Sequence, residues 1–206
     1  MLRLFVRHYK TNSPFVRLYG FIRLLIFPTV WFNNSLSPFR GRIACFGCGY
    51  GVLETILAVL NPNLTVEASD LSMARIAIAK SATINIPNIS FSVSDTCTGR
   101  EKATHFLCID LLHHLRLNEQ EPFLAKLWDM LPTKGCLIIK DVDTKPYWKY
   151  CWSYIHDSLF VGPPINIRSS DFYKKFFYTR NAKINHLIPS DFKSPYSHYL
   201  LLIWKK

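Results

Sequence analysis

The segment Cys45-Phe46-Gly47-Cys48-Gly49-Tyr50-Gly51 lies between an apolar run at residues 43–46 and a run of helical periodicity that begins at Leu53. Glycine permits a tight turn and lets the backbone approach a ligand closely. The helix that follows offers N–H groups and the positive end of its dipole. We therefore predict a strand–turn–helix unit that binds a nucleotide-type ligand at the turn.

The same alternation of apolar runs and helical patterns continues to the end of the sequence. Five predicted strands cover residues 43–46, 64–68, 89–93, 105–109 and 136–140, with helical patterns at residues 53–60, 72–80 and 117–130. Two further strand-like runs, residues 182–188 and 197–204, are separated only by a loop and predict an antiparallel hairpin. The pattern indicates an α/β fold with a mostly parallel, seven-stranded, Rossmann-like sheet and helices on both faces.

A carboxylate at the end of the second predicted strand extends the ligand site. Asp70 follows Gly47 by 23 residues, and an acid in this place accepts hydrogen bonds from both ribose hydroxyls of an adenosine group. An alternative role for Asp70 is to cap the helix that starts near Ser72. The glycines are spaced G-x-G-x-G, and Val52 occupies the position of the third glycine of the dinucleotide fingerprint, which disfavours an NAD-dependent oxidoreductase.

At these positions the chain resembles the class I S-adenosylmethionine-dependent methyltransferases, and the resemblance covers about residues 40–206. It rests on the glycine segment and on four later motifs: Ala68-Ser69-Asp70-Leu71-Ser72, Ser94-Asp95, Asp110-Leu111-Leu112-His113-His114-Leu115 and residues 131–140. The resemblance implies the Rossmann-like class I methyltransferase fold, an enzyme that transfers methyl groups, and S-adenosyl-L-methionine as its cofactor.

The resemblance also implies which residues bind the cofactor. The methionine end would be surrounded by Gly47, Gly49 and Gly51, with Phe46 and Cys48. The ribose would be held by Asp70, with Leu71, and the adenine amine would face Asp95 and Thr96. Asp110 would lie beside the methionine portion or the acceptor. An ordinary turn role for Asp95 is the alternative. The family usually carries an acid two positions before the first glycine, where this chain has Cys45.

Three residues are candidates for catalysis. His113 and His114 follow the fourth predicted strand, at the edge where open α/β sheets bind ligands, and one of them would remove a proton from the acceptor. Packing beneath the cofactor is the alternative for this pair. Asp141, with Asp143, would orient the acceptor. A plain turn, or a divalent metal held with Asp110, is the alternative, and we expect no metal.

The acceptor is expected to be a small, hydrophobic or lipid-like molecule, methylated at oxygen. Aromatic residues are crowded between Trp148 and Phe160, where they would cover the acceptor or, alternatively, pack a helix onto the sheet. The segment from Asp110 to His113 lacks the Asn/Asp-Pro-Pro motif common in enzymes that methylate base amino groups, so nucleic acid is not favoured. A non-catalytic protein of this fold that acts on RNA or an anionic membrane remains the alternative function.

Charge and length complete the expectations. The 206 residues indicate one methyltransferase domain, residues 1–206, with a helical cap at residues 1–40 and a Rossmann-like core at residues 41–206. The net charge is +11, and no acidic residue precedes Glu54. An amphipathic helix before Pro28 would pack on the core or lie on a membrane surface. Without a secretory signal, a cytoplasmic location is expected, with peripheral contact to the inner membrane face as an alternative.

Overall fold

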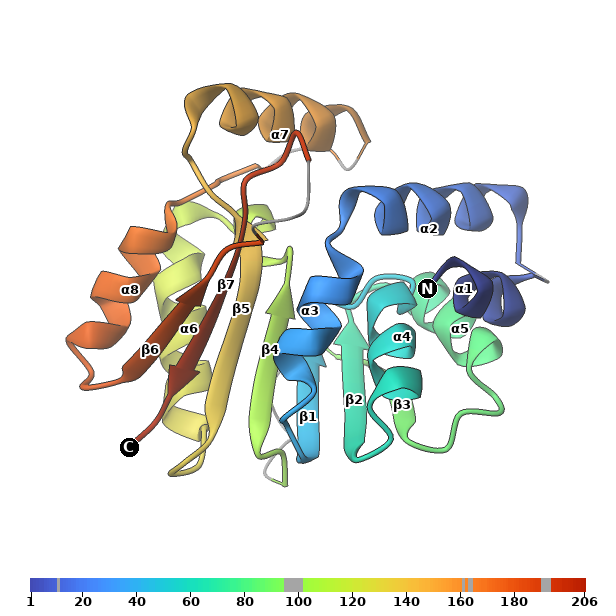
Figure 1. Ribbon diagram of the computed structural model, residues 1–206, viewed down its shortest axis with the longest axis horizontal. Helices are drawn as coiled ribbons and strands as arrows, with labels where there is room; N and C mark the ends of the chain where they lie inside the picture. Colours follow the sequence, from blue (N-terminus) through green and yellow to red (C-terminus); the bar gives the residue numbers. More distant parts are fainter. Residues whose placement is uncertain (11, 95–101, 161, 163–164, 190–193) are drawn as a thin grey trace. The chain divides into compact units, whose positions relative to one another are not determined.

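The computed structural model describes residues 1–10, 12–94, 102–160, 162, 165–189 and 194–206. These residues form two compact units, Met1–Ala103 and Thr104–Lys206, here called unit 1 and unit 2 (Figure 1). Each unit combines helices with a section of β-sheet, and each is described separately below.

Unit 1 begins with three helices and continues as alternating strands and helices. Its elements are α1 (Leu2–Tyr9), α2 (Pro14–Ile26), α3 (Thr29–Leu36), β1 (Gly41–Phe46), α4 (Val52–Leu60), β2 (Leu64–Asp70), α5 (Met73–Ala82) and β3 (Ile89–Val93). The strands are parallel, in the order β3-β2-β1. Helices α4 and α5 pack against β2 and β3 (Figure 1). Because parallel strands all end at one edge, β2 delivers Asp70 to the edge at which β1 enters the glycine segment.

The N-terminal helices form by local signals that are partly visible in the sequence. The Ser13 side chain accepts a hydrogen bond from the N–H of Val16 at 3.4 Å, and Pro14 occupies the first turn of α2. The predicted helix before Pro28 is confirmed as α2; α1 and α3 also lie within residues 1–40, where a helical cap was predicted without their bounds. Gly20 lets α2 approach α1 closely, because a Cβ atom there would lie 2.3 Å from the Phe5 ring.

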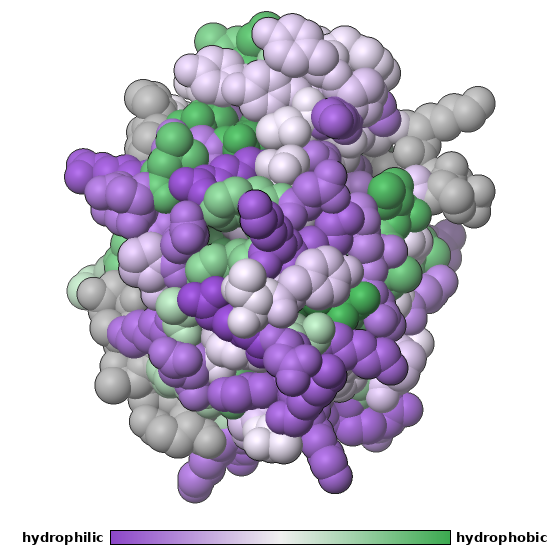
Figure 2. All heavy atoms as spheres, turned by 90° about the vertical axis from the view of Figure 1, so that its left-hand side faces the viewer, coloured by the Kyte–Doolittle hydropathy of each residue, from purple (hydrophilic) through white to green (hydrophobic). Residues whose placement is uncertain are grey.

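Unit 2 contains the last four strands. Its elements are β4 (His105–Ile109), the short 3₁₀ helix η1 (Leu112–His114), α6 (Leu117–Met130), β5 (Cys136–Val142), α7 (Tyr147–Phe160), α8 (Ser170–Tyr178), β6 (Lys183–Leu187) and β7 (His198–Trp204). The strand order is β4-β5-β7-β6; β4 and β5 are parallel, and β7 runs antiparallel to both of its neighbours. Helix α8 packs against β6 and β7. Hydrophilic side chains predominate on the side of the unit that α8 and β6 form (Figure 2).

The predicted fold class is confirmed. The described residues contain parallel strands joined through helices and end in the antiparallel pair β6–β7 that the last two apolar runs predict. Helix α6 has the predicted bounds, and Ser72 caps α5 through a hydrogen bond from the N–H of Arg75 at 3.3 Å. Strands β1, β2 and β5 extend the predicted ranges by two residues each, whereas α8 was not expected.

Among the described residues, no single helix has the length and apolar character needed to cross a membrane. Helices α2 and α3 meet these criteria only as a pair, and the chain bends by 74° between them.

Candidate active site

The glycine segment in unit 1 forms a turn that only glycines accommodate without strain. Gly47, Gly49 and Gly51 have φ angles of 69°, 55° and 71°, in the left-handed region that disfavours residues with a Cβ atom. The N–H of Cys48 donates to the carbonyl of Ser69 at 3.0 Å, so the turn is tied to β2. The turn ends at Gly51, directly before α4, which confirms the predicted strand–turn–helix unit.

Asp70 connects the glycine turn to the following helix. Its Oδ2 accepts a hydrogen bond from the N–H of Gly49 at 2.8 Å, and its Oδ1 accepts one from the N–H of Ser72 at 2.9 Å. The N-cap of α5 is Ser72, so the capping role considered for Asp70 belongs to Ser72 instead. The two residues that the sequence reading combined into one site, Gly49 and Asp70, are therefore in direct contact.

The two sides of the turn differ in the space around them. A Cβ atom on Gly49 would meet nothing within 4 Å, whereas one on Gly51 would lie 2.5 Å from the Phe91 ring. The side chain of Leu71, beside Asp70, is 71% exposed. The turn thus presents an open surface at Gly49, next to a carboxylate and an exposed apolar side chain, while Gly51 is fixed in the packed interior.

Tyr9 is a residue of this site that the sequence reading missed. Its hydroxyl donates to the carbonyl of Tyr50 at 2.8 Å and lies 3.2 Å from the hydroxyl of Thr55. Tyr50 also meets the ring of Tyr19, with centroids 5.0 Å apart. Helices α1 and α2 are thereby bound to the glycine turn. Phe5 and Tyr9, one helical turn apart, are the signal that a buried face exists in α1.

Cys45, which replaces the usual acid of the family, lies in the core of unit 1. Its side chain is buried, and its carbonyl accepts a hydrogen bond from the Ser69 hydroxyl at 3.3 Å. Asp70 is the carboxylate that contacts the turn in this unit.

In unit 2, Asp110 is held at the end of β4 in a strained conformation. Its φ angle is 47°, which costs an L-residue of this type on the order of 1 kcal/mol. Its Oδ1 accepts a hydrogen bond from Nζ of Lys140 at 2.5 Å, and Lys140 is fully buried in β5. Lys140 was not singled out in the sequence, because a lysine inside an apolar strand gives no indication of its partner.

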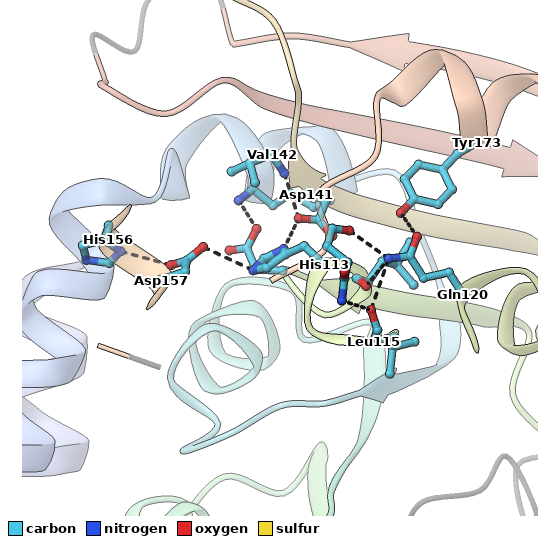
Figure 3. A network of polar contacts seen from close by, with 12 residues as sticks. His113, Leu115, Gln120, Asp141, Val142, His156, Asp157 and Tyr173 are labelled. Atoms are coloured by element: carbon cyan, nitrogen blue, oxygen red, sulfur yellow. Dashed lines mark hydrogen bonds and ion pairs between the residues drawn. The ribbon is translucent and has the colours of Figure 1, made fainter. Parts of the chain in front are cut away.

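His113 lies between two carboxylates (Figure 3). Its Nδ1 is 2.5 Å from Oδ1 of Asp141, and its Nε2 is 3.4 Å from Oδ2 of Asp157, which lies on α7. Oδ2 of Asp141 is buried and has no hydrogen-bond partner among the described residues. The structure therefore joins two of the predicted catalytic residues, His113 and Asp141, and adds Asp157.

The two neighbouring histidines differ in their electrostatics. Burial lowers the pKa of His113, but the charges of Asp141, Asp110 and Asp157 outweigh burial, so this pKa lies above its ordinary value of 6.5. Burial and the charge of His113 lower the pKa of His114 to about 4. The charged form of His113 is therefore favoured relative to an ordinary imidazole, while His114 is a neutral imidazole at neutral pH.

A polar network fixes the backbone that carries these histidines (Figure 3). Nε2 of Gln120, fully buried in α6, donates to the carbonyls of Leu112 and Asn166 at 3.0 and 2.9 Å. The Tyr173 hydroxyl donates to Oε1 of Gln120 at 2.9 Å, and the N–H of Asn166 donates to the carbonyl of His113 at 2.7 Å. The 3₁₀ helix is therefore attached to α6 and α8 by groups far apart in the sequence.

The remaining predicted residues are placed as follows. Asp95 and Thr96 lie outside the described residues. Asp143 accepts hydrogen bonds from the N–H and hydroxyl of Ser170, the first residue of α8, whose N-cap is Ser169. Trp148 and Trp152 on α7 are exposed, so the helix does not bury them by packing onto the sheet.

The contrast between Gly49 and Gly51 yields a stability prediction. Gly51→Ala adds a steric clash with Phe91 to the backbone strain, and should lower the free energy of unfolding by about 2–5 kcal/mol. Gly49→Ala meets open space and should cost only the backbone strain, about 1–2 kcal/mol. Urea unfolding of both variants measures the difference; equal losses would contradict the assigned packing of the turn.

The two histidines should show opposite pH dependence. The charged form of His113 stabilises the folded state fully below pH 6.5, and this stabilisation is lost as the pH rises through the raised folded pKa. The unfolding free energy of the wild type minus that of His113→Gln should therefore decrease from pH 6 towards pH 9.

His114→Gln is the matched control for this experiment. Because the folded pKa is lowered to about 4, the wild type loses stability as the pH falls below 6.5. The wild type should lose on the order of 3 kcal/mol relative to the variant by pH 4. Denaturant titrations across this range measure both differences, and parallel curves for the two variants would refute the assignment.

Comparison with known proteins agrees with this geometry. The family model described as methyltransferase small domain matches residues 29–109. A curated relative, ribosomal RNA small subunit methyltransferase C of Photobacterium profundum, is 30% identical over 111 residues, which are 52% of this chain and 33% of the relative. The chain thus spans about a third of the length of the curated relative that it matches.

Solved structures share the fold at low identity. Magnesium protoporphyrin IX methyltransferase of Synechocystis PCC 6803, described with bound SAH, superposes with a TM-score of 0.68 at 19% identity, over 99% of this chain and 94% of that one. An O-methyltransferase family protein of Burkholderia thailandensis superposes with a TM-score of 0.69 at 13% identity, over 86% of this chain and 56% of that one. The glycine turn joined to Asp70, the matched family model and this shared fold make the chain similar to the class I S-adenosylmethionine-dependent methyltransferases, whose Rossmann-like fold it has.

Proposed function

We propose that this protein transfers a methyl group from S-adenosyl-L-methionine to an oxygen atom of a small, hydrophobic or lipid-like acceptor. The observation that carries the proposal is the contact between Asp70 and the N–H of Gly49 at 2.8 Å, beside the open surface of the turn. The contact supports the proposal because it holds the carboxylate of Asp70, proposed to bind the ribose, beside the turn proposed to receive the methionine end.

The residues of unit 1 fit this cofactor. A carboxylate has about four lone-pair sites, and two of those on Asp70 accept the N–H groups of Gly49 and Ser72. The other two remain for the two ribose hydroxyls. Gly49 leaves space for close approach of a ligand, and exposed Leu71 offers an apolar face to a base. The N-terminus of α4 faces the same turn, where its dipole favours the cofactor's carboxylate.

The cofactor, when bound, supplies a methyl group on a positively charged sulfur, which an acceptor oxygen attacks in line. The protein then has to hold the acceptor and, for a hydroxyl, take up its proton. In unit 2, His114 is the candidate for contacting the acceptor and taking up its proton, because its imidazole is neutral and only partly buried. His113, held by Asp141 and Asp157, is a positioning residue next to it, with the two ring centroids 4.1 Å apart.

The low pKa of His114 favours an acidic oxygen in the acceptor. Moving a proton from a water-like hydroxyl, a far weaker acid than a phenol, to a base of pKa about 4 is strongly unfavourable. For a phenol the cost is roughly 8 kcal/mol, and a carboxyl group, with a pKa near 4, is already ionised at neutral pH. We therefore favour a carboxylate or a phenolic hydroxyl as the acceptor group.

The names of similar proteins agree with such an acceptor. Structural neighbours include an O-methyltransferase family 2 protein of Planctomyces limnophilus DSM 3776, described in complex with apigenin, and the magnesium protoporphyrin IX methyltransferase. The exposed Trp148 and Trp152 on α7 lie on the helix that also carries Asp157. These side chains supply an aromatic surface for an apolar acceptor.

RNA is a second candidate acceptor. The curated relative is a ribosomal RNA methyltransferase, and the net charge of +11 suits a polyanion. Against it, the segment Asp110-Leu111-Leu112-His113 replaces the Asn/Asp-Pro-Pro motif, and Asp110 is paired with Lys140. Identifying the molecule that receives the methyl group distinguishes RNA from a small-molecule acceptor.

Substitution of Asp70 tests the cofactor site. Asp70→Asn keeps the size of the side chain but removes the charge and half of its acceptor capacity. It should weaken the binding of S-adenosylmethionine and its demethylated product by at least ~10-fold, or about 1.4 kcal/mol, in calorimetric titrations. Asp171→Asn, on the exposed surface of α8, is the matched control and should bind as the wild type does. Unchanged affinity in Asp70→Asn rules out the proposed site.

A labelling experiment tests the acceptor. With methyl-labelled S-adenosylmethionine, label should appear in organic-soluble products of a cell extract and in a phenolic or carboxylate compound among them. His114→Ala should reduce this transfer by roughly 10²-fold or more for a phenol, while cofactor affinity stays unchanged. Label found in RNA instead would replace the small-molecule proposal with the second candidate.

A further inference from the structure

Helix α2 carries apolar side chains on its outer as well as its inner face. Val16 and Gly20 are buried towards α1. Four residues on the opposite side, spaced as one face of a helix, are exposed: Phe15 by 67%, Leu18 by 59%, Ile22 by 37% and Leu25 by 60%. A solvated helix normally shows polar residues there. The apolar outer face is therefore available for an external contact.

Helix α1, in the same unit, also exposes apolar side chains. Leu2 and Val6, one helical turn apart, are exposed by 47% and 50%, while Phe5 and Tyr9 of the same helix are buried. Both helices lie at the periphery of unit 1 (Figure 1). We call the exposed residues Leu2, Val6, Phe15, Leu18, Ile22 and Leu25 the outer apolar face.

Exposed basic side chains accompany the outer apolar face along the same two helices. Arg3, Arg7 and Arg17 are exposed among its residues, and Lys10 is exposed after α1. No acidic residue precedes Glu54, and Glu54 is itself buried. The first 40 residues therefore present apolar and basic side chains together, with no negative charge of their own.

We propose that the outer apolar face and its arginines dock this protein onto an anionic lipid bilayer. A bilayer surface accepts both kinds of side chain, since apolar groups enter the boundary of the acyl chains while arginines contact the phosphates. A nucleic acid satisfies the arginines but leaves exposed Leu18, Ile22 and Leu25 in water. The helices lie in the plane of the interface, as amphipathic helices do.

The docking surface is mechanically connected to the cofactor turn. Tyr9 of α1 donates a hydrogen bond to the carbonyl of Tyr50 in the turn, and Tyr19 of α2 packs against the Tyr50 ring. Docking of α1 and α2 therefore holds the glycine turn near the bilayer surface. Access to a lipid-like acceptor from the bilayer rests on the proposed function, whereas docking itself does not depend on it.

Vesicle binding tests the proposal. The full chain is sedimented with vesicles of phosphatidylcholine alone and with vesicles containing 30% phosphatidylglycerol, an amount chosen to supply ~0.3 anionic charge per lipid. We expect binding to the anionic vesicles that weakens as salt is raised, and much weaker binding to the neutral ones. Absence of binding to anionic vesicles at low salt overturns the proposal.

Two variants test the two parts of the surface. Leu18→Asp with Ile22→Asp should weaken binding by at least ~10-fold. Changing Arg3, Arg7 and Arg17 to Gln should weaken it by roughly 100-fold, since each basic side chain contributes a factor of about five. Ile84→Asp, which also places a charge at an exposed apolar site of unit 1, is the control and should bind normally.

Measurements in solution keep the outcomes distinct. Thermal unfolding and calorimetric binding of S-adenosylmethionine show whether each variant is folded. If the variant with Leu18→Asp and Ile22→Asp unfolds, the variant with the three arginines changed to Gln provides the test. Undiminished vesicle binding by both variants overturns the assigned surface. Binding of an RNA homopolymer that exceeds vesicle binding and is lost in the arginine variant overturns the bilayer as the partner. Failure of cofactor binding by the wild type would count against the proposed function alone.

Discussion

The carboxylate of Asp70 is the constraint on which the candidate site depends. It accepts one backbone N–H from the glycine turn and one from the start of the next helix, so one side chain fixes the ends of β1 and β2 relative to each other. A residue buried in this way would ordinarily be assigned a structural role. Carboxylates have more acceptor sites than these two contacts use, so holding the turn and binding a ribose are compatible functions of Asp70.

In unit 2, His113 and His114 have different surroundings, although the sequence predicted the same role for either of them. His113 and His114 are adjacent, but His113 lies between Asp141 and Asp157, while His114 has the ring of His113 as a close neighbour. Their pKa values therefore move in opposite directions. The resulting neutral imidazole suits an acceptor oxygen that is already acidic, which connects the electrostatics of the site to the chemical class of the acceptor.

The N-terminal helices connect the surface of unit 1 to its ligand site. Tyr9 binds the glycine turn from one side of α1, and the residues of the opposite side are exposed. Helix α2 buries Val16 and Gly20 on one side and exposes apolar Leu18 and Leu25 on the other, so these outer side chains contribute little to the interior. Substitutions on the outer side are therefore expected to affect docking more than folding.

The sequence by itself determined the fold class, the glycine turn and the place of Asp70, because each depends on local spacing: apolar runs, glycines at positive φ and a strand end. It also predicted α2, α6 and the C-terminal hairpin. Only the tertiary structure decided the partners of His113 and Lys140, the contact of Tyr9 with the turn and the exposure of the α7 aromatics. The contacts of His113 with Asp141, of Lys140 with Asp110 and of Tyr9 with Tyr50 join residues 28 to 41 positions apart. Distance, burial and charge between such groups arise from packing, which spacing along the chain does not encode.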